Sequence, residues 1–261
     1  MKLTIRVIGS DRTIKAEASA NNSVYLVYNQ EYAQGDMLCL CAEAQGYVVA
    51  CLEDSMPETY GYLASNYEMA VPFGEKRASY SPKSFTGKVH LLTARVATDE
   101  EISRYRNLAL NPFDCHENKG LFPHATANVE TRGESVFAAR NAINGNHANA
   151  GHGEWPFESW GINRDPDAQM RIDFGRTVCV DKAVFTTRAD FPHDSYWTQA
   201  TIEFSDGSQE VVKLSNSYDE QIFDFSPRKV AYAIIKELKK ADNESPFPAL
   251  SQIELWGKEE K

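Results

Sequence analysis

QMRIDFG, residues 169–175, and VCVDKAVFTTR, residues 178–188, are neighbouring runs rich in β-branched and aromatic residues. Runs of this kind, bounded by turn residues, are typical of strands. Six further runs have the same character: ATANVET (125–131), TQATIEFS (198–205), QEVVKLS (209–215), EQIFDFS (220–226), RKVAYAIIKEL (228–238) and LSQIELWG (250–257). Eight strands in about 150 residues predict an all-β jelly roll.

The first 97 residues also predict β structure. Five runs there have strand character: KLTIRVIG (2–9), SVYLVYN (23–29), MLCLCAE (37–43), YVVACLE (47–53) and KVHLLTARV (88–96). Turn-rich segments such as SANNS and EAQG separate them, which predicts an antiparallel β-sandwich. The sequence leaves the role of this sandwich open.

A helical connector is predicted at residues 98–110, TDEEISRYRNLAL. Thr98 is a typical N-cap residue, an acidic first turn follows it, and Asn111-Pro112 ends the helical pattern. All four tryptophans and five of the six histidines come after residue 110. This change in composition predicts two domains, at 1–97 and 108–257.

Charge and composition restrict the classes of partner. The chain of 261 residues has 37 acidic and 27 basic residues, a net charge of −10. A field of this sign disfavours nucleic acid and anionic membranes as main partners. The N-terminal MKLTIRVIGSDR has no continuous apolar run like that of a signal peptide, which favours a cytoplasmic location. An odd number of irregularly spaced cysteines, five, argues against a disulfide framework.

The sequence carries no common catalytic motif: HExxH, GxSxG, a Walker loop and a GxGxxG after a strand do not occur. Glu154 and Glu158 could form a glycosidase pair, but two glutamates in an acidic loop are more often solvated. His147 and His152 share the same loop without a nearby cysteine. Solvated or ligand-contacting histidines are therefore expected there rather than metal ligands.

Five segments of the second half follow one another in a familiar order: AARNAINGN (138–146), ESWGI (158–162), MRIDFGRTVCVDKAVF (170–185), TIEFSDGSQ (201–209) and ALSQIELWG (249–257). Together they resemble the discoidin, or coagulation-factor type C, domain of the galactose-binding-like superfamily. That pattern has an A-x-N-A-I-D-G-N turn, a tryptophan, an "ID-LG" strand and a final "EI-x-V-x-G" strand. The resemblance does not extend to residues 1–97.

The resemblance implies a jelly-roll binding module with its site among the loops at one end. Relatives include carbohydrate-binding modules of bacterial glycoside hydrolases, and others bind phospholipid or protein. Many hold calcium near the I-D-G turn through an Asp and a Glu. Here Asn144 and Gln252 occupy those two positions, so both carboxylates are amides. We therefore expect no tight calcium and no other cofactor, with both amides in structural hydrogen bonds.

Two loops have the composition of a binding surface, HGEWPFESWGINRD (152–165) and TTRADFPHDSYW (186–197). A sugar site needs an aromatic platform for the apolar face of the ring, and charged or amide groups for its hydroxyls. The predicted ligand-binding residues are Trp155, Phe157, Trp160, Arg164, Arg188, Asp190, His193, Asp194, Tyr196 and Trp197.

Each of these residues also has a structural alternative. Trp160 occupies the position of the family's recurrent core tryptophan, and Trp197 could pack at the start of the next strand. Arg188 and Asp190 could pair and fix their loop. Trp155, beside a glycine and a proline, is the best exposed platform.

The sequence thus predicts a non-catalytic carbohydrate-binding protein. The alternative is a protein–protein interaction module within an oligomer or complex, because Trp, Tyr and Arg also dominate protein interfaces. A glycoside-active enzyme using Glu154 or Asp194 comes third. A small polar pocket would favour sugar, a broad flat apolar patch would favour protein, and two carboxylates about 5–10 Å apart across a cleft would favour the enzyme.

Overall fold

Alternating apolar residues build the first half of the molecule. In the computed structural model, which describes residues 1–260, Leu3, Ile5 and Val7 of the first strand are fully buried. The elements of this half are β1 (Lys2–Ile8), β2 (Ile14–Asn21), β3 (Ser23–Tyr28), β4 (Met37–Ala42), β5 (Gly46–Cys51), β6 (Thr59–Leu63), β7 (Tyr67–Ala70), η1 (Gly74–Ser79) and β8 (His90–Val96). All five predicted strands are present, whereas β2, β6 and β7 lie outside the predicted runs.

Two antiparallel sheets of the first half pack into a sandwich. One has the strand order β2-β1-β4-β7, and the other has the order β10-β6-β5-β8-β3. Strand β10 (Leu121–Phe122) comes from beyond the connector, and Leu121 and Phe113 belong to the core of the sandwich. The core of the first sandwich therefore includes residues from the second half, because Phe113 and Leu121 are buried in the sandwich and not in the jelly roll.

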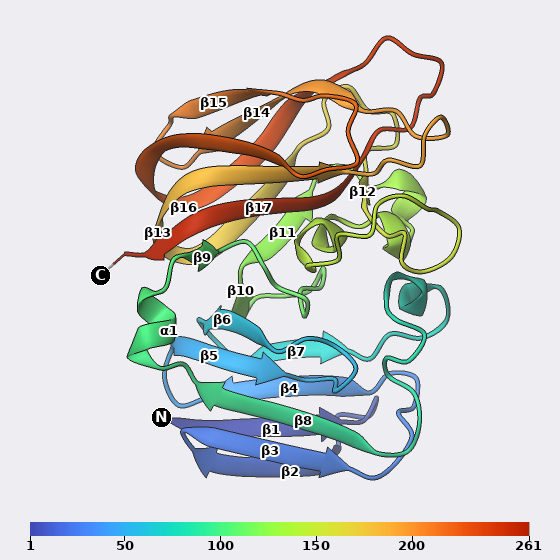
Figure 1. Ribbon diagram of the computed structural model, residues 1–261. Helices are drawn as coiled ribbons and strands as arrows, with labels where there is room; N and C mark the ends of the chain where they lie inside the picture. The colour runs from blue at the N-terminus through green and yellow to red at the C-terminus, as the bar shows by residue number, and fades with distance from the viewer. Residues whose placement is uncertain (261) are drawn as a thin grey trace.

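The second half lies above the first in Figure 1 and is also all-β. Its elements are β9 (Arg106–Asn107), β10, β11 (His124–Ala127), η2 (Thr131–Gly133), η3 (Ser135–Phe137), η4 (Ala139–Ile143), β12 (Trp160–Gly161), β13 (Met170–Thr187), β14 (Trp197–Phe204), β15 (Gln209–Lys213), β16 (Gln221–Lys240) and β17 (Ala249–Glu259). The main sheet runs β12-β17-β13-β16-β14-β15, with β11 on β13 and β9 on β17, eight strands in all. The predicted fold class, an all-β jelly roll beside a β-sandwich, is confirmed.

Two pairs of predicted strands are continuous in the structure. β13 joins the runs at 169–175 and 178–188, with a shift of register between Asp173 and Val178 and a positive φ at Gly175. β16 likewise joins the runs on either side of Pro227. At these bends one long strand passes from one layer of the jelly roll to the other. The sheet still has eight strands, because the short strands β9, β11 and β12 also belong to it.

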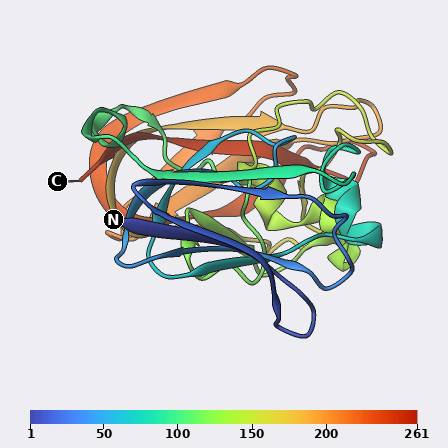
Figure 2. The same cartoon turned by 90° about the horizontal axis from the view of Figure 1, so that it is seen from below.

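The connector is less helical than predicted. Helix α1 covers only Asp99–Ser103, although Thr98 and Glu101 form the expected capping box. Arg104 is already extended, because the chain turns to pair Arg106 with Gly257 of β17. Figures 1 and 2 show α1 beside the end of β17.

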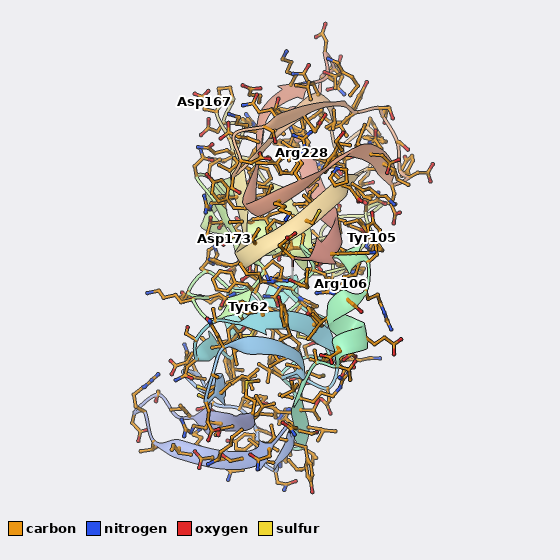
Figure 3. The ribbon with its side chains drawn as sticks, turned by 90° about the vertical axis from the view of Figure 1, so that its left-hand side faces the viewer. Tyr62, Tyr105, Arg106, Asp167, Asp173 and Arg228 are labelled. Atoms are coloured by element: carbon orange, nitrogen blue, oxygen red, sulfur yellow. The ribbon has the colours of Figure 1, made fainter. Side chains whose placement is uncertain are left out.

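A cluster of charged and aromatic side chains forms one of the contacts between the two halves. Arg106 and Arg176 both form ion pairs with the buried carboxylate of Glu259, and the Arg106 guanidinium lies 3.6 Å from the ring centre of Tyr60. Figure 3 shows Arg106 and Tyr62 at this junction. Among residues 1–260, no helix is both long and apolar enough to span a membrane.

Candidate functional site

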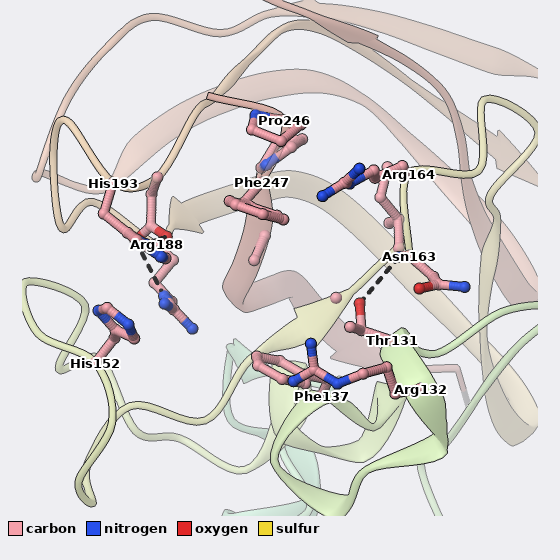
Figure 4. A pocket seen from close by; sticks show the side chains of 15 residues that line it. Thr131, Arg132, Phe137, His152, Asn163, Arg164, Arg188, His193, Pro246 and Phe247 are labelled. Atoms are coloured by element: carbon pink, nitrogen blue, oxygen red, sulfur yellow. Dashed lines mark hydrogen bonds and ion pairs between the residues drawn. The ribbon is translucent and has the colours of Figure 1, made fainter. Parts of the chain in front are cut away.

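A pocket of about 480 Å³ opens at one end of the jelly roll, among the loops that connect the strands (Figure 4). Its walls come from the η2–η3 region, the turn after β12, the loop between β13 and β14, and the segment before β17. The lining residues are Thr131, Arg132, Phe137, His152, Gly161, Ile162, Asn163, Arg164, Arg188, His193, Asp194, Pro246, Phe247, Pro248 and Ala249.

Phe247 forms the aromatic wall of the pocket. Its side chain is 44% exposed, and it sits between Pro246 and Pro248, which restrict the backbone on either side. The His193 ring lies nearly parallel to it, at 16° and 5.6 Å between ring centres, and the Arg164 guanidinium lies 4.9 Å from its centre. His193 therefore stacks on the ring and Arg164 lies over it, while 44% of the side chain stays exposed at the pocket.

Two histidines stack at the mouth. The rings of His152 and His193 are 4.0 Å apart at 20°, although they come from different loops. His152 Nδ1 donates to Oδ2 of Asp190 at 2.8 Å, and this hydrogen bond holds the pKa of Asp190 below its usual range. The histidine pair thus joins the two loops that the sequence predicts as binding surface.

A buried ion pair lies behind these histidines. Arg188 Nε donates to Oδ2 of Asp194, which also accepts the backbone N–H of Asp190. His193 Nδ1 lies 3.0 Å from the other oxygen of Asp194. Three groups thus contact the Asp194 carboxylate, which therefore orients the loop. The other N–H groups of Arg188 remain available to the pocket.

The opposite wall is formed by Phe137 and by residues of two tight turns. Asn163 donates its backbone N–H to Oγ1 of Thr131 at 2.9 Å, and both Asn163 and Arg164 have positive φ. This turn directs the Arg164 side chain toward the cavity, opposite Arg188 (Figure 4). The Arg132 guanidinium lies over Phe137, 5.5 Å from the ring centre.

Four predicted ligand-binding residues line this pocket: Arg164, Arg188, His193 and Asp194. Asp190 lies next to it through its bond to His152. Trp155, Phe157 and Tyr196 are not part of the lining. Trp155 is 39% exposed, and Tyr196 packs edge-on against Phe191 instead.

The structure corrects the prediction for Trp160 and Trp197. Both side chains are fully buried and their rings lie 6.5 Å apart in the core of the jelly roll. Trp160 Nε1 donates to the carbonyl of Val129. β12 and β14 direct these rings inward, so they support the loops rather than contact a ligand.

Sequence reasoning missed Phe247, Phe137, Asn163 and Thr131, and it did not place His152 in the site. Phe247 lies in SPFP, residues 245–248, where an aromatic residue stands between two prolines just before the last strand. That local pattern was the one available signal. The other residues are ordinary in sequence and meet only through the fold.

The carboxylates are not arranged as in a glycosidase. Within residues 1–260, Asp194 is the only carboxylate among the lining side chains, and it is held by Arg188. Glu158 is buried and accepts hydrogen bonds from Asn144 and Asn146. Glu154 is exposed. The predicted pair Glu154 and Glu158 therefore does not face a common cleft.

The turn that holds calcium in relatives of the resembled family is organised by an amide. Gln252 Nε2 donates to the carbonyl of Asn141 at 2.6 Å, to Oδ1 of Asn144 at 2.8 Å and to the carbonyl of Ser251. Its Oε1 accepts the backbone N–H of Gly145. Because an N–H donor stands where oxygens would converge on a cation, these residues do not fit calcium.

No family model matches the sequence, and no curated protein matches it. Solved structures similar to part of the chain include chitosan-binding module 1 of a chitosanase/glucanase from Paenibacillus sp. IK-5. This module shares 19% identity over 58% of this chain and 99% of its own length, with a TM-score of 0.41.

Two other neighbours are a family 32 carbohydrate-binding module from C. perfringens NanJ in complex with galactose and the lectin domain of Lectinolysin complexed with Lewis B antigen. The first shares 18% identity over 51% of this chain and 91% of its own, with a TM-score of 0.39. The second shares 16% over 57% and 95%, with a TM-score of 0.43.

Proposed function

We propose that this protein is a non-catalytic carbohydrate-binding protein, and that the sugar binds in the pocket between Phe247 and Phe137. One observation carries the proposal: an exposed aromatic ring and several strong hydrogen-bond donors converge on one concave site. Arg164 and Arg188 approach the cavity from opposite sides, and His193 stacks on Phe247.

The chemistry of a sugar suits this arrangement. A pyranose has an apolar face of C–H groups, which packs on an aromatic ring, and hydroxyls around its edge. Guanidinium groups donate several hydrogen bonds in one plane, and a histidine nitrogen can donate or accept. A cavity of about 480 Å³ lies in the usual range for small-ligand sites and holds one or two sugar rings.

A glycan array on the full chain tests the proposal, followed by calorimetry on the best hit. Phe247→Ala should weaken binding about tenfold or more, which is about 1.4 kcal/mol. Trp155→Ala is the matched control, because this aromatic residue is exposed to a similar extent but lies outside the lining. Equal losses in both variants would move the site to the 152–165 loop, and an array without a hit would reject the carbohydrate proposal.

The non-catalytic part of the proposal rests on the carboxylates. A hydrolase of the usual kind needs two, and Asp194, the pocket's single one in the described part of the chain, is already paired. Incubation of the bound glycan with the protein should leave it intact in mass spectrometry. Cleavage that disappears in Asp194→Asn would restore the enzyme alternative.

The protein-interaction alternative is separated by the same experiments. Binding to a protein should lose affinity through residues spread over a broad surface rather than through one pocket. If the array is empty while the Phe247→Ala variant loses a protein partner, the pocket serves a protein interface instead.

A further inference from the structure

Three side chains with metal-binding atoms meet at one end of the first sandwich. Glu53 follows the end of β5, Asp54 is next to it, and His90 begins β8. Their ligand atoms all lie within 4.8 Å of one another. Glu53 and His90 are each 1% exposed, whereas Asp54 is exposed, so the cluster runs from the interior to solvent.

Two buried polar atoms of this cluster have no hydrogen-bond partner among the described residues. They are Oε2 of Glu53 and Nδ1 of His90. The two atoms are 3.9 Å apart, which is too far for a direct hydrogen bond. Leaving such atoms buried and unpaired is unfavourable, and more so when the group is charged. We therefore expect an ion or a water molecule to bridge Oε2 of Glu53 and Nδ1 of His90.

The other polar atom of each side chain is already used. Nε2 of His90 lies 3.2 Å from the carbonyl oxygen of Gly87, and a carbonyl can only accept a hydrogen bond. Nε2 therefore carries a proton and is used by Gly87, which leaves Nδ1 as the free ring nitrogen turned toward Glu53. Oε1 of Glu53 accepts a hydrogen bond from Oγ of Ser55 at 2.9 Å. Nδ1 and Oε2 thus face each other without a hydrogen bond to each other or to any other described side chain.

Hydrogen bonds of this kind are what orient metal ligands in proteins. A metal-binding histidine usually donates its second N–H to a carbonyl or carboxylate, and a ligating carboxylate is itself hydrogen-bonded. Aromatic packing fixes the His90 ring as well: Tyr32 lies 4.1 Å from it between ring centres and Tyr28 lies 6.1 Å from it. The cluster therefore has its supporting contacts in place.

We propose that Glu53, Asp54 and His90 form a binding site for a divalent transition-metal ion of the zinc type. Zinc–ligand bonds of about 2.0–2.2 Å place two tetrahedral ligand atoms about 3.3 Å apart, so Nδ1 and Oε2 need to approach by only about half an ångström. The nitrogen ligand favours zinc and its neighbours over calcium or magnesium. The exposed Asp54 provides the third ligand and leaves a fourth position for water.

Two other clusters of similar composition are satisfied without an ion. His152 is directly hydrogen-bonded to Asp190, and His147 lies 3.2 Å from Glu254. Both are exposed to solvent on the histidine side. Because each histidine there already has a carboxylate partner, we do not propose metal sites at these clusters. Variants of their histidines serve as controls in the zinc-binding experiment.

The test is zinc binding by the full chain, measured by calorimetry and by thermal unfolding in chelator-buffered zinc. Zinc should raise the melting temperature, and Asp54→Asn should weaken zinc binding about tenfold or more. His147→Gln/His152→Gln is the matched control and should bind zinc like the wild type. Cobalt should give the visible absorption of a tetrahedral site, and this absorption should be lost in His90→Gln.

Three outcomes would overturn the proposal. The wild type could show no zinc binding at micromolar concentrations, which would mean that a water molecule bridges Glu53 and His90. Zinc binding could survive both Asp54→Asn and Glu53→Gln. It could also disappear in the His147→Gln/His152→Gln control, which would place the ion elsewhere. If His90→Gln does not fold, the exposed Asp54→Asn decides the question.

Discussion

Arg188 and Asp194 form a buried ion pair directly behind the pocket. Nε of Arg188 donates to Oδ2 of Asp194 at 3.0 Å, and the two side chains are 4% and 1% exposed. The same carboxylate holds the backbone of Asp190 and the ring of His193. One acidic residue therefore fixes both the loop and the guanidinium that lines the pocket.

Removing one member of this pair should destabilise the fold. In Asp194→Ala, the Arg188 charge stays buried without a partner, which typically costs about 3–5 kcal/mol. We expect the free energy of unfolding in urea to fall by about 3 kcal/mol. The double variant Arg188→Met/Asp194→Leu should recover much of this loss but bind no sugar. A single variant as stable as the wild type would show that solvent reaches the pair.

The charge of the pocket predicts the kind of sugar, given the proposed function. Arg132 is paired with Glu134 and Arg188 with Asp194, whereas Arg164 has no acidic partner among the described ion pairs. An acidic sugar should therefore bind more tightly than its neutral parent. For example, glucuronate should bind more tightly than glucose. Calorimetry at low salt measures the difference, and Arg164→Gln should remove it. Equal affinities in the wild type would contradict the prediction.

Stability should fall as the pH rises above neutrality because of two histidines. A hydrogen bond to Glu130 raises the pKa of His116. For His124, burial lowers the pKa, but the hydrogen bond and charge of Asp114 outweigh it, so the pKa is also raised. The folded state keeps both protons to higher pH than the unfolded chain, whose histidines titrate near 6.5.

The stabilisation from these protons is complete below pH 6.5 and is lost as the pH rises through the folded pKa values. Urea unfolding from about pH 6 to about pH 9 should show this decline. His116→Gln/His124→Gln should flatten the profile. A decline of equal size in the variant would assign it to other groups.

The two-domain prediction can be tested on a fragment. The second core cluster lies wholly between Leu108 and Leu255, so residues 108–261 contain all of it. Phe113 and Leu121 belong to the first core, however, and the fragment exposes them. We expect a cooperative thermal transition at a lower temperature than in the full chain. Phe113→Ser/Leu121→Ser should improve the solubility of the fragment, and a fragment without a cooperative transition would make the prediction wrong.

Alternating burial explains which strands could be predicted. In β3, Val24, Leu26 and Tyr28 are buried while the residues between them are exposed, and this pattern is visible in the sequence. β2 is an edge strand whose inward residues are the alanines Ala16, Ala18 and Ala20, so the alternation of IKAEASAN is only weakly apolar. The continuity of β13 depends on a positive φ at Gly175, which an isolated sequence does not reveal.

The site was only partly predictable, because composition does not tell which way a side chain points. Trp160 and Trp197 have the residue type of a sugar platform but face the core. Tyr232, in the apolar run 228–238, is half-buried with the Arg171 guanidinium 3.5 Å from its ring centre. Phe247 enters the site from a segment remote in sequence from the predicted loops, and only the fold brings it there.

The amide network of Asn144 and Gln252 predicts how the protein responds to calcium. In the wild type, the side-chain N–H group of Gln252 holds the turn by donating to three oxygens, so the turn needs no cation. The melting temperature should therefore be the same with calcium and with chelator. A chelator-sensitive wild type would show that the amides still act as ligands.

The double variant Asn144→Asp/Gln252→Glu should reverse this behaviour. It removes the amide donors of Gln252 and Asn144 and adds two carboxylates next to that of Glu158, so negative oxygens converge without a bridge. Repulsion should lower the melting temperature in chelator, and calcium, which prefers six to eight oxygens, should restore it. Calcium at about 100 times its dissociation constant would contribute about 2.7 kcal/mol to the free energy of unfolding. Single variants are the matched controls, because one carboxylate gives half the charge. A double variant that calcium does not stabilise would mean that the turn lacks the remaining oxygens of a calcium site.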